Sequence, residues 1–161
     1  MSRVMTLPIE NVQTYPRPPL LEPVPHMVTV RLGGVEIVRT TRALRVCETH
    51  HAPTYYIPFA DIRAERSEAA GGSFCEWKGR ARYWTLPCSA GWRPSAAAGT
   101  TPSPTPRFAG LVDHMAIYAQ AMEACTVGGL PVTPQPGDFY GGWVMPNLEG
   151  IVKGGPGTMG W

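Results

Sequence analysis

The sequence is poor in charged residues and contains no long hydrophobic run. Only 16% of its 161 residues are Asp, Glu, Lys or Arg, and the formal net charge is +2. Nucleic-acid binding needs a concentrated basic surface, so this weak charge balance argues against a nucleic-acid partner. No window approaches the roughly 18 consecutive apolar residues of a membrane-spanning helix, so we expect no membrane partner.

Closely spaced cysteines are also absent. The four cysteines (Cys47, Cys75, Cys88 and Cys125) lie far apart and never form Cys-x-x-Cys. The commonest zinc-binding spacing is therefore missing, and we expect neither a metal nor a cofactor. The first ten residues lack the basic-then-apolar order of a secretory signal. We expect a cytoplasmic protein with reduced thiols; the alternative, a secreted protein with two disulfides, has no further support.

Glycine and proline are abundant. There are 18 of each, more than a fifth of the chain, which argues against long helices and favours short strands joined by tight turns. The length suits one domain with one core. We therefore predict a mainly β fold (α+β at most) of antiparallel strands in a single small domain. Residues 1–26 carry six prolines and read as an extended lead-in to a domain over residues 27–161.

Local patterns predict the order of the elements. Alternating apolar residues on both sides of Gly33-Gly34 predict a hairpin over residues 28–37, and Gly128-Gly129 predicts a last hairpin over 125–132. The other predicted elements are strands at 43–49, 54–57, 74–78 and 81–86, one helical turn at 58–61, a loop insertion at 95–107, and one short helix within 108–122. Ten glycines follow residue 127, and we expect that segment to be packed on the sheet by Phe139, Tyr140, Trp143 and Trp161.

Several long and specific motifs run through the chain. They are Thr41–Val46, Glu48–Pro58, Cys75–Gly79, Ala81–Trp84, Pro134–Trp143 and Lys153–Trp161. In this order they resemble the family called domain of unknown function 427 (DUF427), from about residue 28 onward, and the lead-in is similar to that of longer members. The resemblance implies a small β-tent-like fold, similar to that of methionine sulfoxide reductase B, Yippee and cereblon. It also implies a nucleotidyltransferase-like label without an assigned reaction.

The β-tent relatives often hold a zinc ion between two Cys-x-x-Cys pairs. This chain has no such pair, so the resemblance does not extend to a structural zinc. His50 and His51 follow Glu48 closely, but adjacent residues of a strand point to opposite faces, so at most one of them joins Glu48. Their spacing does not match a metal site, and we predict none.

Charged residues flank the predicted strand at 43–49. Alternation places Arg42 and Glu48 at the two ends of the row that contains Leu44 and Val46, roughly 20 Å apart. Each charge then needs its own partner or solvent, because an unpaired buried charge is costly. One interpretation is structural hydrogen bonding at the sheet rims. The other is that Glu48 lines a cleft as a general base or a ligand acceptor.

Two further side chains are candidates for chemistry. Lys78 precedes Gly79, where a bare backbone leaves room for an anionic group; the alternative is a surface lysine whose stem lies along apolar neighbours. Cys75 becomes a nucleophile if a nearby cation lowers its pKa, whereas a buried cysteine without such a neighbour is inert.

The leading hypothesis is that the domain binds a small polar or anionic ligand in a cleft. The residues expected to line this cleft are Arg42, Glu48, Tyr55, Lys78 and Tyr83. Arg42 and Lys78 hold an anion, Glu48 orients or deprotonates, and the tyrosines stack or donate. The sequence does not decide whether the domain is an enzyme; the catalytic candidates are Glu48, Lys78 and Cys75.

Two rival functions stay open. The first is an interaction module without chemistry, in which exposed aromatic residues such as Tyr140 or Trp143 dock a partner protein. The second is thiol chemistry at Cys75. Neither the ligand nor the oligomeric state follows from the sequence.

Overall fold

The computed structural model describes residues 7–65, 67–75, 78–86, 98–136, 142–150 and 152. Short strands dominate them, as the glycine and proline content predicted. In chain order the elements are β1 (Glu10–Asn11), η1 (Val12–Thr14), β2 (Leu20–Val24), β3 (Val28–Leu32), β4 (Val35–Thr40), β5 (Ala43–Cys47), β6 (Thr54–Pro58), η2 (Phe59–Asp61), β7 (Ser67–Cys75), β8 (Gly79–Thr85), β9 (Ala98–Thr100), η3 (Pro106–Leu111), β10 (His114–Ile117), η4 (Ala119–Ala121), β11 (Ala124–Val127), β12 (Leu130–Pro131), β13 (Thr133–Pro134), β14 (Trp143–Val144) and β15 (Leu148–Glu149).

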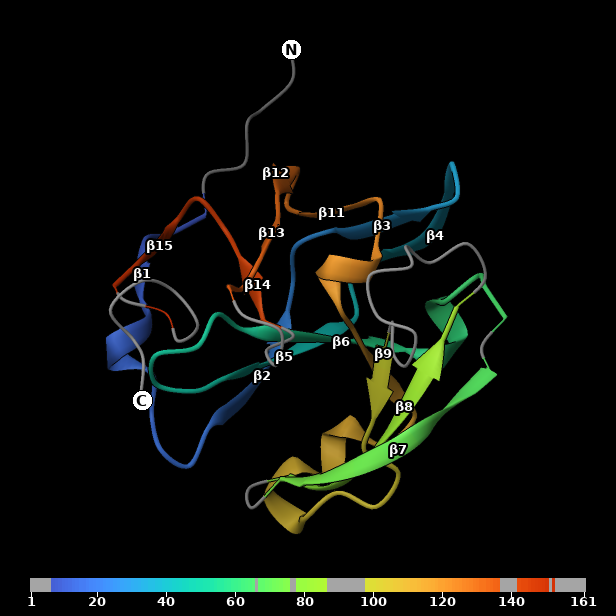
Figure 1. Cartoon of the computed structure of the whole chain (residues 1–161). Coiled ribbons are helices and arrows are strands. Elements are labelled where there is room, and N and C mark those ends of the chain that lie inside the picture. The colour runs from blue at the N-terminus through green and yellow to red at the C-terminus, as the bar shows by residue number, and fades with distance from the viewer. Residues whose placement is uncertain are drawn as a thin grey trace.

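These strands form two large antiparallel sheets and two small strand pairs. The seven-stranded sheet has the order β2-β5-β6-β10-β9-β8-β7, and the four-stranded sheet has the order β12-β11-β3-β4. β1 pairs with β15 in parallel, and β13 pairs with β14 in antiparallel fashion. Figure 1 shows β3, β4 and β11 above the seven-stranded sheet, with β1 and β15 together at the left edge. The predicted mainly β, antiparallel, single small domain is confirmed.

Both predicted glycine hairpins are present. Gly33 and Gly34 adopt φ of 61° and 77° between β3 and β4, and Gly128 and Gly129 adopt 57° and 82° between β11 and β12. A two-residue turn with positive φ at both positions matches the twist of the flanking strands, and glycine adopts it without steric cost. The strands predicted at 43–49, 54–57 and 81–86 correspond to β5, β6 and β8, and the helical turn at 58–61 corresponds to η2.

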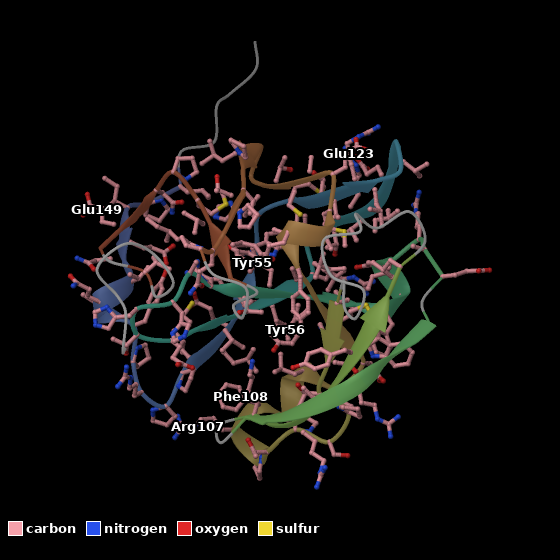
Figure 2. All side chains as sticks on the ribbon, viewed as in Figure 1. Tyr55, Tyr56, Arg107, Phe108, Glu123 and Glu149 are labelled. Atoms are coloured by element: carbon pink, nitrogen blue, oxygen red, sulfur yellow. The ribbon has the colours of Figure 1, made fainter. Side chains whose placement is uncertain are left out.

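The seven-stranded sheet is covered on both faces. On one face the larger core packs it against the four-stranded sheet, with members Val30, Tyr55, Ile57, Met115, Ile117 and Val127. On the other face a smaller core closes under η3, with members Val46, Tyr56, Phe108, Leu111 and Ala116. Figure 2 shows the consequence at β6: Tyr55 points toward β14, whereas its neighbour Tyr56 points toward Phe108. Consecutive residues of this strand therefore belong to the cores on opposite faces of the sheet.

The single helix predicted within residues 108–122 is wrong in its central part. η3 ends at Leu111, residues 114–117 form β10 in the middle of the seven-stranded sheet, and a second helical turn, η4, covers Ala119–Ala121. Met115, Ala116 and Ile117 are all buried because the two cores lie on opposite sides of this strand. A strand that is buried on both faces shows a continuous apolar run, which periodicity alone does not separate from a buried helix.

Two segments with little predicted structure contribute strands. Residues 98–100, within the predicted loop insertion at 95–107, form β9 between β10 and β8. Residues 20–24, within the predicted lead-in, form the edge strand β2. None of the helices found in the described ranges has the length and apolar character of a membrane span. Several predictions concern residues or side chains that the structure does not describe, namely those on Phe139, Tyr140, Trp161 and the side chain of Cys75.

Candidate functional site

A row of three polar side chains crosses the edge of the seven-stranded sheet. Glu22 of β2 lies directly opposite Arg45 of β5, and Arg45 lies directly opposite Tyr55 of β6. Directly opposed residues of antiparallel strands share a face and have neighbouring Cβ atoms. The strand registers therefore bring a carboxylate, a guanidinium and a phenol together on the face that carries the larger core.

The N-terminal segment adds a second carboxylate to this row. The backbone N–H of Glu10 donates to the carbonyl of Asn147 at 2.9 Å, in the parallel pair of β1 and β15. Asn11 then caps η1, because its Oδ1 accepts from the N–H of Gln13 at 2.9 Å. This short ordered stretch places Glu10 beside Arg45 and allows the Tyr15 hydroxyl to donate to Glu10 Oε1 at 2.7 Å.

Arg45 is clamped between the two carboxylates. Its Nη1 and Nη2 donate to the two oxygens of Glu10 at 3.1 and 2.8 Å, and its Nε donates to Glu22 Oε1 at 2.7 Å. The three side chains are mostly shielded, with 17% of Arg45, 20% of Glu10 and 32% of Glu22 exposed. Partly buried, bidentate pairing of this kind is stronger than a surface ion pair and fixes the orientation of all three groups.

This clamp forms one wall of a cavity of about 220 Å³, which we call the Arg45 cavity. Its polar lining consists of Glu10, Glu22, His26, Arg45, Tyr55 and Asn147, and its apolar lining includes Leu7, Val24, Val127, Met145 and Leu148. Ligand sites in proteins typically combine apolar walls with a few oriented polar groups, and the Arg45 cavity has both. Its volume, below that of a drug-sized pocket, suits a small molecule.

Tyr55, which lines the cavity, is held in place by a second aromatic ring. The Tyr55 ring stacks on Trp143 with 4.7 Å between ring centroids and 20° between their planes. Trp143 is fully buried, and its Nε1 donates to the Ile117 carbonyl at 2.8 Å. Trp143 therefore anchors the C-terminal segment on the sheet. It is also too buried to act as the exposed aromatic of an interaction module, while Tyr140 lies outside the described residues.

Tyr15, Tyr55 and Arg45 keep their ordinary charge states near neutral pH. Burial raises the pKa of Tyr55, although the neighbouring Arg45 opposes this, and burial with the Glu10 hydrogen bond raises the pKa of Tyr15. Burial, the largest single influence, lowers the pKa of Arg45. The hydrogen bonds to Glu10 and Glu22 and the charge interactions with Cys47 and Tyr55 together outweigh it, and the pKa lies above its usual value. Neutral phenols and a permanent guanidinium suit binding and orientation, rather than proton transfer near neutral pH.

Cys47 also belongs to this environment, with its Sγ 4.0 Å from Glu22 Oε1. Burial raises its pKa to about 12, partly opposed by Arg45, and burial likewise raises the pKa of Cys125 to about 12. Both side chains are free thiols and are buried. The thiolate is the reactive form, so these two cysteines are inert at neutral pH.

We therefore predict very slow thiol labelling of the folded protein. In a Cys75→Ser/Cys88→Ser background, a disulfide reagent at pH 8 should leave Cys47 and Cys125 unmodified, and both should react at once after denaturation. Because their pKa values lie above pH 8, the thiolate fraction, and with it the labelling rate, should rise with each step in pH toward 12. Rapid labelling of the native protein would show that at least one thiol is accessible and activated.

The structure distributes the sequence-predicted site residues over several places. Tyr55 lines the Arg45 cavity. Arg42 lies just before β5 and pairs with Asp61, with its Nε donating to Asp61 Oδ2 at 3.1 Å, and its side chain is 64% exposed. Glu48 follows the other end of β5, where its Oε2 lies 3.3 Å from Nδ1 of His51. Arg42 and Glu48 are therefore at opposite ends of one strand, each with a local partner.

Lys78 lies on the opposite side of the sheet from Tyr55. Its Nζ donates to the Tyr56 hydroxyl at 2.9 Å and lies 5.5 Å from the centre of that ring. Tyr83 is on β8, directly opposite Gly99 of β9. The structure thus does not bring Lys78 and Tyr55 to one cavity. Among the described residues, no group of three His, Cys, Asp or Glu side chains has the arrangement of a metal site.

The chain matches the profile of a known protein family. The profile of a protein family described as "Domain of unknown function (DUF427)" matches residues 20–128, which is about two thirds of the chain. The matched range includes Glu22, Arg45 and Tyr55, whereas Glu10 and Asn147 lie outside it. No curated protein matches the chain.

Proposed function

The chain belongs to the DUF427 family of domains of unknown function, and from this premise we propose that it binds a small polar ligand in the Arg45 cavity. The observation that carries the proposal is the position of the Glu10–Arg45–Glu22 clamp in the wall of a cavity of about 220 Å³. Polar groups that are buried and fixed beside an apolar cavity orient a ligand at low entropic cost.

Binding is better supported than catalysis by the groups at this cavity. Cys47, Tyr15 and Tyr55 are held in their protonated forms, because burial raises the pKa of each. A nucleophile or general base needs the opposite, a pKa moved toward the working pH. Of these three groups Tyr55 lines the cavity, where its neutral hydroxyl and its ring are suited to recognition.

A ligand screen with matched variants tests the proposal. The unfolding temperature is measured against a panel of nucleotides, carboxylic acids, amines and sugars, and each stabilising compound is then tested on two tryptophan variants. Leu148→Trp fills the cavity from β15, whereas Leu20→Trp places the same ring on an exposed site of β2 away from the lining. Stabilisation by a genuine ligand should be lost in Leu148→Trp and kept in Leu20→Trp.

Two further variants locate a ligand that binds elsewhere. Arg42→Gln and Lys78→Ala remove the cations of the cleft predicted from the sequence, and neither residue lines the Arg45 cavity. Stabilisation that survives Leu148→Trp but is lost in Arg42→Gln or Lys78→Ala would move the site away from Arg45 and contradict the proposal.

A further inference from the structure

We propose that the ligand of the Arg45 cavity is a small organic cation, an ammonium group on a short apolar body. This inference rests on the proposed function and adds the chemical class of the ligand. It differs from the small polar or anionic ligand that Arg42 and Lys78 suggested, because neither of those cations lines the cavity.

The charge balance of the lining favours a cation. Two carboxylates, Glu10 and Glu22, face one guanidinium, that of Arg45, which leaves one net negative charge when His26 is counted as neutral. In a partly desolvated cavity an incoming cation is attracted to this excess charge, and an incoming anion is repelled.

The hydrogen-bonding capacity of the lining points the same way. Arg45 donates to carboxylate oxygens from all three of its nitrogens, so most of its five N–H groups are already engaged. One acceptor remains: Oε2 of Glu22 has no hydrogen-bond partner within the described ranges, because the contacts of this carboxylate with Arg45 and Cys47 are made by Oε1. A carboxylate oxygen without a donor is complemented by one, and an ammonium group supplies three.

The remaining lining defines the body of the ligand. Leu7, Val24, Val127, Met145 and Leu148 are apolar, and the ring of Tyr55 adds an aromatic wall. Burying the carbons of a short alkyl chain against these groups is favourable, because each methylene group is removed from water. A volume of about 220 Å³ limits that chain to a few carbon atoms.

Three ligands of nearly equal size test the charge requirement directly. Pentylamine, pentanol and pentanoate differ mainly in the charge of one end, and their affinities for the wild-type protein are measured by titration calorimetry at one pH and ionic strength. We expect the amine to bind about tenfold more tightly than the alcohol, and pentanoate to bind most weakly. Equal or tighter binding of pentanoate would overturn the organic-cation assignment.

A matched pair of carboxylate variants assigns the effect to the cavity. Glu22→Gln removes the charge but leaves Arg45 paired with Glu10. Glu36→Gln alters a carboxylate of nearly the same exposure, 31%, that pairs with Arg39 and does not line the Arg45 cavity. Glu22→Gln should weaken pentylamine about tenfold and leave pentanol within about twofold, and Glu36→Gln should change neither. The unfolding temperature of each variant shows whether it is folded.

The outcomes separate the two proposals. Binding of pentanol and pentylamine with equal affinity, or an amine affinity unchanged in Glu22→Gln, would overturn the cation assignment and leave the Arg45 cavity as a binding site. Failure of all three compounds to bind at millimolar concentration, together with no stabilising compound in the ligand screen, would overturn both.

Discussion

Replacing Arg45 by methionine should lower the free energy of unfolding by about 3 kcal/mol at neutral pH. The substitution keeps an unbranched side chain of similar length but leaves Glu10 and Glu22, both mostly shielded, without their shared counter-ion. Removing one partner of a buried ion pair costs more than the pair contributes, because the remaining charge stays desolvated. Urea unfolding followed by circular dichroism measures the loss.

Arg42→Met is the control for Arg45→Met, because the Arg42 side chain is 64% exposed and Asp61 keeps the Thr40 hydroxyl as a second donor. Its loss should be less than about 1 kcal/mol. Equal losses in the two variants would show that the clamp is not shielded.

Replacing Trp143 by alanine should cost about 4 kcal/mol of unfolding free energy. This side chain is fully buried, stacks on Tyr55 and donates to the Ile117 carbonyl at 2.8 Å. Its removal leaves a large void between β14 and the seven-stranded sheet and a buried carbonyl without its donor.

Leu20→Ala, which truncates an exposed side chain, is the control for Trp143→Ala. Leu20→Ala removes an apolar side chain that is 42% exposed and should change stability by less than about 0.5 kcal/mol. The Trp143 variant should also lose affinity for any ligand of the Arg45 cavity, because Tyr55 loses the ring that supports it. A loss below about 1 kcal/mol would mean that the C-terminal segment is not anchored through this ring.

The local features of the fold were predictable because they depend on neighbours in sequence. Gly33-Gly34 and Gly128-Gly129 define hairpins through backbone conformations that glycine adopts most easily. The segment at 108–122 was mispredicted because burial on both faces of β10 removes the alternation by which a strand is recognised. Burial on both faces results from the packing of two cores and is not encoded in the spacing of residues.

The clamp shows what a single sequence does not reveal. Alternation along β5 does place the Arg45 side chain on the opposite face of the sheet from Leu44 and Val46. Its contact with Glu22, however, depends on the pairing of β2 with β5, which the sequence does not reveal. Pro23 lies within β2, and its proline-rich surroundings read as a lead-in. An edge strand tolerates proline because one of its sides has no strand partner. Glu10 is placed beside Arg45 by the parallel pairing of β1 with β15, which joins residues almost 140 positions apart in the sequence.

The candidate residues Arg42, Glu48 and Lys78 illustrate the same limit. Each is a charged side chain in a motif shared with the family, and each has a local partner: Asp61, His51 and Tyr56 respectively. Tyr55 was predicted as a ligand-binding residue and lines the Arg45 cavity, and its role in binding stays a prediction. Residue type alone did not distinguish locally paired charges from the clamp at the cavity.

The most direct test of the Arg45 cavity as a ligand site is an amide and arginine-side-chain NMR titration of the wild-type protein with pentylamine. We predict chemical-shift changes at the Nε of Arg45 and at the backbone amides of Glu10, Tyr55 and Leu148, all of which saturate together. Changes that instead cluster around Arg42, Lys78 or Tyr83, with the Arg45 signals unmoved, would contradict it.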